Sequence, residues 1–594
     1  MILLGEGPVS KYIAKNSERI KNWPEWVREF AVKYGSKTAN LYIVHGNIRD
    51  YLPKETEEGE FIFAPIHKYI AEIVFGNQDI IAYYDRSNGV SFCKEEMASE
   101  YEAVLSKRFP DNTPDDFISA DPEKSFRYLE KYFLMRIPKD RRTPPTRMVL
   151  IIDYAETIIP GGDMLRVTDA DRYCLVTLNR WANNPDFTRG DVSIILLTEN
   201  LVDISPRLAG SSSTVTIGVP FPDEAIRVSF LRSREREGVL MLDRGLSPER
   251  VASVTSGLNL MNLDKLILER YEENKALTME YLSQKKKEMI EHEAVGLLEF
   301  TETQYDLDAV SGHDFVKRQL RNHAKAIKRG QPEVVPMGYL IAGPIGTGKS
   351  FMVSAFAGEI GIPMVKFRNF RSKWQGESES NLEKVLNILR SMAPVAVMID
   401  EADAFLGDRD QEGDSGTSNR VFAQIASFMG DTAYRGKIIW FLITCRPDLL
   451  PIDLKRQGRA EEHFDLFYPE TLSEKAALFE TLVKKNKFGV HTFSVSDLFK
   501  KYSHDVSGAE IESMLIRAMR RAATEGRSMI SKQDMEEEME DFIPPAYPHE
   551  IRLQNLVAAV ECTSKKMVPK RFQLTNSDMV REIQELKTLL GEMK

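Results

Sequence analysis

Short apolar runs recur along the chain, and longer stretches of mixed charged and apolar residues separate them. In the second half the runs are GYLIA, VAVMID and KIIWFLIT, which begin at residues 338, 395 and 437. The first half carries LYIVHG, DIIAYYD, VLIID and DVSIILLT, which begin at residues 41, 79, 149 and 191. Apolar runs of this length, alternating with helix-forming stretches, are typical of buried strands in parallel sheets. The pattern therefore predicts two α/β units in one chain.

A glycine-rich turn with a lysine follows the first of the downstream runs. Residues 343–350 read GPIGTGKS and lead into a helix-forming stretch, which is the context that the pattern GxxxxGK[ST] requires. The glycines let backbone N–H groups close around phosphates, and the following helix presents its positive end to them. The motif predicts a site for ATP and Mg²⁺, with Lys349 at the terminal phosphates and Ser350 as a metal ligand. The predicted nucleotide contacts are Gly343, Pro344, Ile345, Gly346, Thr347, Gly348, Lys349, Ser350 and Phe351.

Two acidic residues, Asp400 and Glu401, end the second downstream run. Ligands bind beyond the carboxyl ends of the strands in open α/β sheets, so these side chains should face the same site as the glycine-rich turn. We expect Asp400 to hold the magnesium shell and Glu401 to orient and polarise the attacking water.

Further segments resemble the AAA module of the ATPase family that includes katanin, spastin and FtsH. DLDAVSGHDFVKRQL at 306–320 resembles the family's entry segment, and RSKWQGESESNLEKV at 371–385 resembles its pore loop. KRQGR at 455–459 resembles the arginine-finger region, and DVSGAEIESML at 505–515 resembles the start of the lid helix. The resemblance implies an AAA+ P-loop NTPase fold, a parallel α/β sheet with a helical lid.

The resemblance also implies roles for particular residues. Arg456 and Arg459 would reach from one subunit to the nucleotide bound by its neighbour, where their charge stabilises the transition state. That role requires a homo-oligomer, which in this family is a hexamer. The adenine and ribose would be lined by Val310, Ser311, Gly312, Gly508 and Ala509, and an extended polypeptide would be gripped by Lys373, Trp374 and Gln375.

One position departs from the family pattern. Family members usually carry asparagine in ATNRPD, whereas this chain reads ITCRPD with Cys445. A thiol is a weak hydrogen-bond donor and acceptor, so it should position the attacking water less well than an amide. The sequence therefore predicts a catalytic position, Cys445, that makes hydrolysis slow.

The first half repeats the order of these blocks. VLIIDYAET parallels VAVMIDEAD, DVSIILLTENL parallels KIIWFLITCRP, and VTSGLNLMNLDKLIL parallels DVSGAEIESMLIRAM. The segment without a counterpart is the phosphate loop, which would fall at HGNIRDYLP after the strand at 41–46 or, alternatively, at DRSNGVS (85–91). A helix is expected at 63–75, and Tyr154 stands at the position of Glu401. The first half is thus predicted to be a degenerate AAA-like α/β domain that lacks a working site.

The expected organisation has five parts. They are the degenerate domain at 1–261, with its α/β core at 41–220 and lid-like helices at 221–261, a helical connector at 262–300, the large α/β ATPase subdomain at 301–468, the helical lid at 469–543 and a C-terminal extension at 544–594. In the last part, Met579, Ile583, Leu586 and Leu590 form one apolar stripe, which we expect to dock on the lid or on the next subunit. The two-half layout with its charged connector also resembles a group of bacterial and plastid AAA proteins.

Composition narrows the function classes. A formal net charge of -10 over 594 residues disfavours nucleic acid as the main partner. Four scattered cysteines without a paired motif indicate neither a disulfide framework nor a zinc site, and no apolar run is long enough to span a membrane. These features favour the cytoplasm.

The functional expectation is a hexameric, ATP-driven motor that remodels or unfolds a protein substrate. The alternative is a slow ATP-gated assembly or switch protein that threads nothing, which Cys445 favours, and a DNA-dependent ATPase is disfavoured by the charge. The substrate, the pathway and nucleotide binding by the first half are not determined by the sequence.

Overall fold

The computed structural model describes residues 23–55, 61–76, 78–139, 146–161, 167–294, 296–301, 303–329, 331–368, 378–406, 417–490, 492–501, 505–543 and 547–592. The chain forms two compact units. The first comprises Met1–Ile290 with Glu379–Ser391, and the second comprises Glu291–Ser378 with Met392–Lys594.

The first unit is built on a six-stranded sheet in the order β5-β4-β6-β7-β1-β8. All pairings are parallel except that of β5 with β4. Its strands are β1 Leu41–Gly46, β4 Ile80–Asp85, β5 Gly89–Phe92, β6 Met148–Ile152, β7 Val192–Thr198 and β8 Thr214–Val219. Every residue of β6 and β7 is buried, as expected for central strands that are covered on both faces.

Helices before and between these strands supply that cover and share one apolar core with the sheet. They are α3 Glu25–Gly35, α5 Glu95–Arg108, α6 Pro114–Phe117, α7 Pro122–Arg136, α8 Asp169–Ala182, α9 Pro185–Arg189 and α10 Pro206–Ala209. Trp181 of α8 is fully buried in this core, with its ring centroid 5.3 Å from that of Phe126 and 5.8 Å from that of Phe187.

The segment after β1 differs in part from the predicted helix at 63–75. It contains an antiparallel hairpin of β2 (Tyr51–Glu55) and β3 (Phe61–Pro65), and helix begins only with α4 (Ile66–Tyr69), which continues as a π-helical turn at Ile70–Val74. Pro65 marks the boundary because its fixed φ, -54°, suits a helix start. The alternative loop position at 85–91 is wrong, since those residues comprise the end of β4, a tight turn and most of the antiparallel strand β5.

The remaining helices of the first unit are α11 Glu224–Arg236, α12 Pro248–Val254, α13 Leu260–Glu272 and α14 Met279–Glu293. The lid of the second unit has the same succession, in α21 Leu472–Lys485, α22 Val495–Lys501, α23 Gly508–Thr524 and α24 Lys532–Asp541. In both, the loop after the first helix makes a parallel β-contact with the loop before the fourth, Leu242 with Leu277 and Gly489–Val490 with Met529–Ile530. The lid-like part therefore runs through α14, beyond the predicted boundary at residue 261 and into the predicted connector.

The second unit has a sheet of matching order, β14-β10-β13-β12-β11-β9, with β9 antiparallel at one edge. Its strands are β9 Leu298–Thr301, β10 Gly338–Ala342, β11 Met364–Phe367, β12 Val395–Ile399, β13 Ile438–Thr444 and β14 Glu462–Asp465. The five parallel strands occupy the same places as β8, β1, β7, β6 and β4 of the first unit. The α/β fold and its predicted duplication are thus confirmed at the level of sheet topology.

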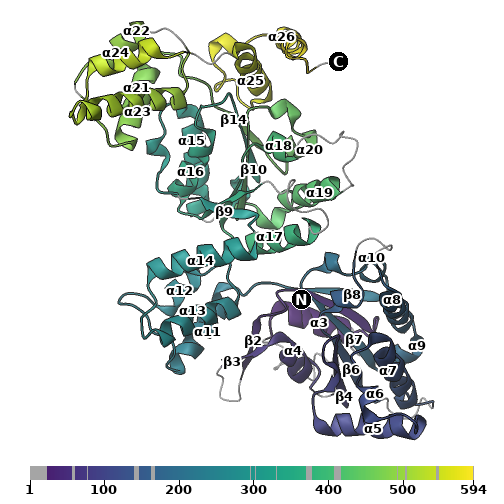
Figure 1. Cartoon of the computed structure of the whole chain (residues 1–594). Coiled ribbons are helices and arrows are strands. Elements are labelled where there is room, and N and C mark those ends of the chain that lie inside the picture. The colour runs from purple at the N-terminus through teal and green to yellow at the C-terminus, as the bar shows by residue number, and fades with distance from the viewer. Residues whose placement is uncertain are drawn as a thin grey trace. The chain divides into compact units, whose positions relative to one another are not determined.

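Helices flank this sheet on both sides. In Figure 1, α15 and α16 lie on one side of β10, and α18, α19 and α20 lie on the other. Their bounds are α15 Asp314–Lys328, α16 Lys349–Ile360, α18 Ala402–Leu406, α19 Thr417–Met429 and α20 Ile452–Lys455. Helix α17 spans Ser378–Met392, and its residues Glu379–Ser391 belong to the first unit.

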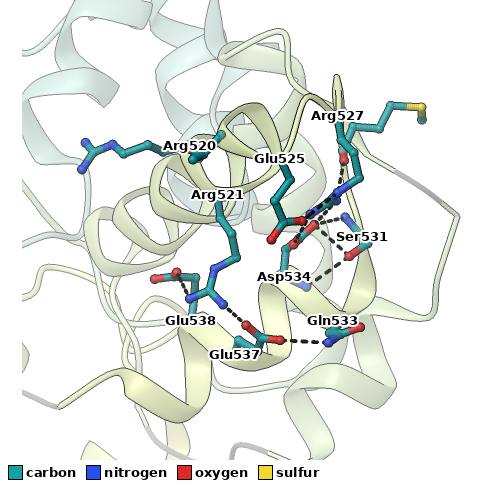
Figure 2. A network of polar contacts seen from close by, with 11 residues as sticks. Arg520, Arg521, Glu525, Arg527, Ser531, Gln533, Asp534, Glu537 and Glu538 are labelled. Atoms are coloured by element: carbon teal, nitrogen blue, oxygen red, sulfur yellow. Dashed lines mark hydrogen bonds and ion pairs between the residues drawn. The ribbon is translucent and has the colours of Figure 1, made fainter.

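Ion pairs fasten the last two helices of the lid to each other. Figure 2 shows Arg527 directed at Asp534, whose oxygens accept from both of its terminal nitrogens at 2.7 Å, and Arg521 between Glu537 and Glu538. Hydrogen bonds from Arg527 hold the pKa of Asp534 well below its usual value, so this carboxylate stays charged. The bonds fix α24 against α23, the helix that approaches the phosphate loop.

The C-terminal extension contains α25 Pro548–Glu561 and α26 Asn576–Leu589. The predicted apolar stripe of α26 packs into a cluster with α25 and with Ala342 and Phe467 of the large subdomain. Docking on the lid is therefore the wrong expectation, because apolar residues of α25 such as Leu553 and Leu556 form the surface that the stripe covers.

Among the described residues, none of the helices combines the length and the apolar character that a membrane span needs.

Candidate nucleotide site

Three glycines shape the loop between β10 and α16. Gly343 has φ +134°, and a Cβ there would lie 2.1 Å from the carbonyl oxygen of Leu466. Gly346 and Gly348 both have φ +82°, in the left-handed region that favours glycine. Gly348 precedes α16 directly, and no side chain caps the helix there. The first N–H groups of α16 are therefore open to an anion, at the end where the helix dipole attracts one.

Lys349 lies under this loop and is only 8% exposed. Its ammonium group donates to the carbonyl oxygens of Gly343 and Pro344, at 2.8 and 2.9 Å, and to Cys445 Sγ at 3.2 Å. Thr444, one residue earlier, donates instead to Asp403 at 2.6 Å. The thiol that replaces the usual amide therefore faces the lysine of the phosphate loop.

The acidic pair lies at the end of β12, beside the loop. Asp400 Oδ2 accepts a hydrogen bond from Ser350 Oγ at 3.3 Å, and Asp400 Oδ1 accepts one from the N–H of Glu401 at 3.1 Å. Glu401 has φ +50°, a left-handed conformation that is uncommon for a residue with a side chain, and it is exposed. Hydroxyl and carboxylate oxygens are the donors that Mg²⁺ takes, so Ser350 and Asp400 fit this metal.

A residue that the sequence analysis missed also reaches Asp400. Lys366 Nζ lies 2.8 Å from Asp400 Oδ2, the oxygen that faces Ser350. Lys366 lies on β11, the strand next to β12. The sequence marks Lys366 only as the single charged residue in the apolar segment MVKF, which indicates a polar partner without naming it.

The lid reaches the loop through the start of α23. Ser507 caps this helix in a capping box with Glu510, and the N–H of Ala509 donates to Gly346 O at 3.4 Å. A Cβ on Gly346 would lie 2.8 Å from Ser507 Oγ, so a glycine permits the approach. Gly508 and Ala509 thus lie beside the loop.

Four other predicted contact residues, Val310, Ser311, Gly312 and Phe351, lie on or near α16 and the start of α15 in the chain. Val310 is buried in the apolar cluster that contains Met352 and Val353, and its carbonyl oxygen accepts from Lys317 Nζ at 2.9 Å. Ser311 and Gly312 follow it, before α15. The Phe351 ring has its centroid 5.5 Å from that of Tyr305 and lies 5.0 Å from Lys485 Nζ of the lid.

The two predicted finger arginines follow α20. The Arg456 side chain is 60% exposed, with Nε 3.9 Å from Asp453. Arg459 is half-buried, and its Nη1 donates to the carbonyl oxygen of Asp453 at 2.7 Å. Partial burial and the positive charge of Arg456 lower the pKa of Arg459. Lys373, Trp374 and Gln375, the predicted pore residues, lie outside the described residues.

The C-terminal extension makes contacts at this site that sequence reasoning missed. Gln554 of α25 accepts a hydrogen bond from the N–H of Ile345 at 3.1 Å, beside the bond that Tyr468 of the large subdomain donates to the carbonyl oxygen of Ile345 at 2.8 Å. Arg446, directly after Cys445, forms a bidentate pair with Glu592 at 2.7 Å. The extension therefore braces both the phosphate loop and the turn that carries Cys445.

Three family models match the chain. Residues 15–220 match the AAA+ chaperone N-terminal Rossmann-like domain, residues 225–295 its second helical domain, and residues 339–468 the ATPase family associated with various cellular activities, AAA.

Curated relatives agree with these matches. The AAA domain-containing protein ycf46 of Trieres chinensis is 32% identical over 294 residues, which is 48% of this chain and 55% of the relative. The ycf46 protein of Gracilaria tenuistipitata var. liui is 30% identical, over 51% of this chain and 60% of the relative. An ATP-dependent zinc metalloprotease FtsH from the Aster yellows witches'-broom phytoplasma (strain AYWB) is 29% identical, over 35% of this chain and 31% of the relative. The chain thus spans little more than half the length of the first of these relatives. With an AAA domain at 339–468 behind two AAA+ chaperone domains, the chain belongs to the AAA+ ATPases.

Proposed function

We propose that the chain binds ATP with Mg²⁺ at residues 343–351, hydrolyses it, and uses the cycle to remodel a protein substrate in a homohexameric ring. The observation that carries the proposal is the geometry beyond the ends of β10 and β12, where Lys349 bonds to the carbonyl oxygens of the loop and the next residue, Ser350, bonds to Asp400. Glu401 extends from the same edge of the sheet.

Each of these side chains has one task in this proposal. The N–H groups of the loop and Lys349 hold the phosphates, and Ser350 and Asp400 hold the metal. Bound magnesium would neutralise charge that develops on the phosphate oxygens. Glu401 orients the attacking water and polarises it for attack on the terminal phosphate.

Assembly is supported by the exposure of Arg456, whose Nε lies 3.9 Å from a carboxylate of the same turn, its one ion pair among the described residues. Such an arginine can reach a nucleotide that a second copy of the chain holds, and hydrolysis then depends on the ring. Polypeptide threading rests on the resemblance of residues 371–385 to a pore loop.

Substitution of Trp374 tests the threading step. Trp374→Ala is expected to abolish unfolding of a tagged, folded substrate protein, because the ring would lose the surface that grips the chain. ATP turnover measured without substrate should be retained, and Trp374→Phe should restore part of the unfolding. Unfolding that survives Trp374→Ala would contradict the threading model. An ATP turnover rate that DNA raises and unfolded protein does not would indicate DNA, and not protein, as the substrate.

A slow ATP-gated switch is the second candidate, and the contact of Cys445 with Lys349 favours it. Cys445→Asn is expected to raise the steady-state rate of phosphate release, because an amide can both donate to and accept from the attacking water. Cys445→Ala serves as the control that removes the thiol without adding an amide. A rate that is unchanged or lower in Cys445→Asn would show that the thiol does not limit hydrolysis.

A further inference from the structure

Two backbone features of the nucleotide site in the second unit recur at equivalent positions of the first unit. Gly46 ends β1 with φ +99°, and a Cβ there would lie 2.6 Å from Val219 O, as one on Gly343 would lie 2.1 Å from Leu466 O. Tyr154 has φ +50°, and its N–H donates to Asp153 at 2.8 Å. Glu401 has the same φ and the corresponding bond to Asp400. The loop at 46–50 therefore occupies the place of the phosphate loop.

Arg49 fills the position that faces the acidic strand. It is the third residue after Gly46, as Gly346 is the third after Gly343. Its Nη1 lies 2.8 Å from Asp153 Oδ2, its Nε lies 3.8 Å from Glu199, and its guanidinium carbon lies 3.9 Å from the centroid of the Tyr154 ring.

The three partners of Arg49 occupy the positions that Asp400, Glu401 and Cys445 have in the second unit. Asp153 thus has a cation of the chain as its partner, as Asp400 has Lys366, but in the first unit this cation belongs to the loop that stands in place of the phosphate loop.

Asp50, the next residue, reaches the lid-like helices. It is 2% exposed, and one carboxylate oxygen accepts from the N–H of Met261 at 3.0 Å in the first turn of α13. Leu260 also donates its N–H to this carboxylate, and Asn47 Nδ2 holds the other oxygen at 2.8 Å. A helix N-terminus attracts negative charge, so this is where a phosphate oxygen would find donors.

The hairpin that follows Asp50 strengthens the same contact. Tyr51 of β2 stacks on Phe230 of α11 at 6.3 Å between ring centroids, and Phe63 of β3 meets the same ring edge-on at 5.0 Å. Phe230 is fully buried. The Asp50 carboxylate and the rings of Tyr51 and Phe63 therefore connect the segment after β1 to the helices α13 and α11.

We propose that the first unit is a self-liganded AAA+ domain, in which Arg49 replaces the metal at Asp153 and Asp50 replaces a phosphate oxygen at α13. The side chains keep the helices 224–293 closed on the sheet without a nucleotide. The second unit differs, because its loop at 343–351 contains no carboxylate. Among the described residues, the lid meets that loop through the backbone bond from Ala509 to Gly346 and through Lys485, whose Nζ lies 5.0 Å from the Phe351 ring. The first unit is accordingly a platform that does not respond to ATP.

Hydrogen exchange of the full chain tests this proposal. In a Lys349→Ala background, which disables the second site, added ATP and Mg²⁺ should leave exchange in residues 260–266 unchanged. Asp50→Ala should speed exchange there about 10- to 100-fold, because buried donors lose their acceptor. The matched control is Asp169→Ala, an exposed carboxylate at the start of another helix, α8, which should leave α13 unaffected.

Two results would overturn the proposal. They are protection of residues 260–266 by ATP in the Lys349→Ala chain, and an Asp50→Ala chain whose exchange equals that of its parent. Should Asp50→Ala fail to fold, Asn47→Ala removes only the hydrogen bond that orients the carboxylate, and it should speed the same exchange to a smaller extent. None of these measurements depends on ATP turnover, so the proposal can fail while the proposed function stands.

Discussion

Replacing Glu401 by glutamine is expected to lower ATP turnover about 10²- to 10⁴-fold while ATP binding is retained. The amide has nearly the shape of the carboxylate but cannot polarise water as a base. The substitution should leave the local structure intact, since the Glu401 side chain is exposed and its left-handed turn is held by the bond from its backbone N–H to Asp400 Oδ1. Phosphate release and binding of a fluorescent ATP analogue would separate the two effects.

The duplicated fold supplies a matched control for this variant. Tyr154 has the same φ and the same bond to a preceding aspartate in the first unit, so Tyr154→Gln puts glutamine at the equivalent position of the unit that has no phosphate loop. Turnover should be unaffected by it. Equal losses in the two variants, or full activity in Glu401→Gln, would contradict the assignment of the base.

Loss of Arg456, the proposed finger arginine, should have an effect of similar or larger size. Arg456→Ala is expected to reduce turnover about 10³- to 10⁵-fold, the range for arginines that act on a neighbour's nucleotide. Binding of ATP should persist, because Arg456 makes no contact with the loop at 343–351 among the described interactions of its own chain. Arg520→Ala removes an exposed arginine of the lid that points away from the network in Figure 2 and controls for the change in charge.

Mixing two inactive variants tests the action in trans directly. When Arg456→Ala and Glu401→Gln chains assemble together, some interfaces combine an intact Glu401 with an intact Arg456 from the next chain. Turnover should therefore recover on mixing, to a level that depends on the ratio of the two chains. No recovery in confirmed mixed oligomers would place Arg456 outside the neighbour's site.

Several parts of the site could be predicted from sequence because their physical cause is local. Gly343, Gly346 and Gly348 are needed for left-handed backbone, and Lys349 and Ser350 follow them directly at the helix start. The acidic pair ends an apolar strand, and strand ends converge at one edge of a parallel sheet. The repeat in the first half could be predicted for the same reason, since each of its central strands is an apolar run in the sequence.

The contacts that the sequence did not predict join residues far apart in the chain. Lys366 reaches Asp400 only because β11 pairs with β12, and Gln554 reaches Ile345 only because α25 packs beside the sheet. The stripe on α26 was visible, but its partner was not, because an apolar face specifies burial without specifying a surface.

The sequence by itself determined two α/β halves, one with the phosphate loop and acidic pair, and one without them. Only the tertiary structure decided what the loop at 46–50 does instead. Nothing local links Arg49 to Asp153 or Asp50 to Met261, which stand more than a hundred residues further along the chain. Charge pairing and helix capping of this kind depend on distances of a few ångströms, and folding of the sheet and helices sets those distances.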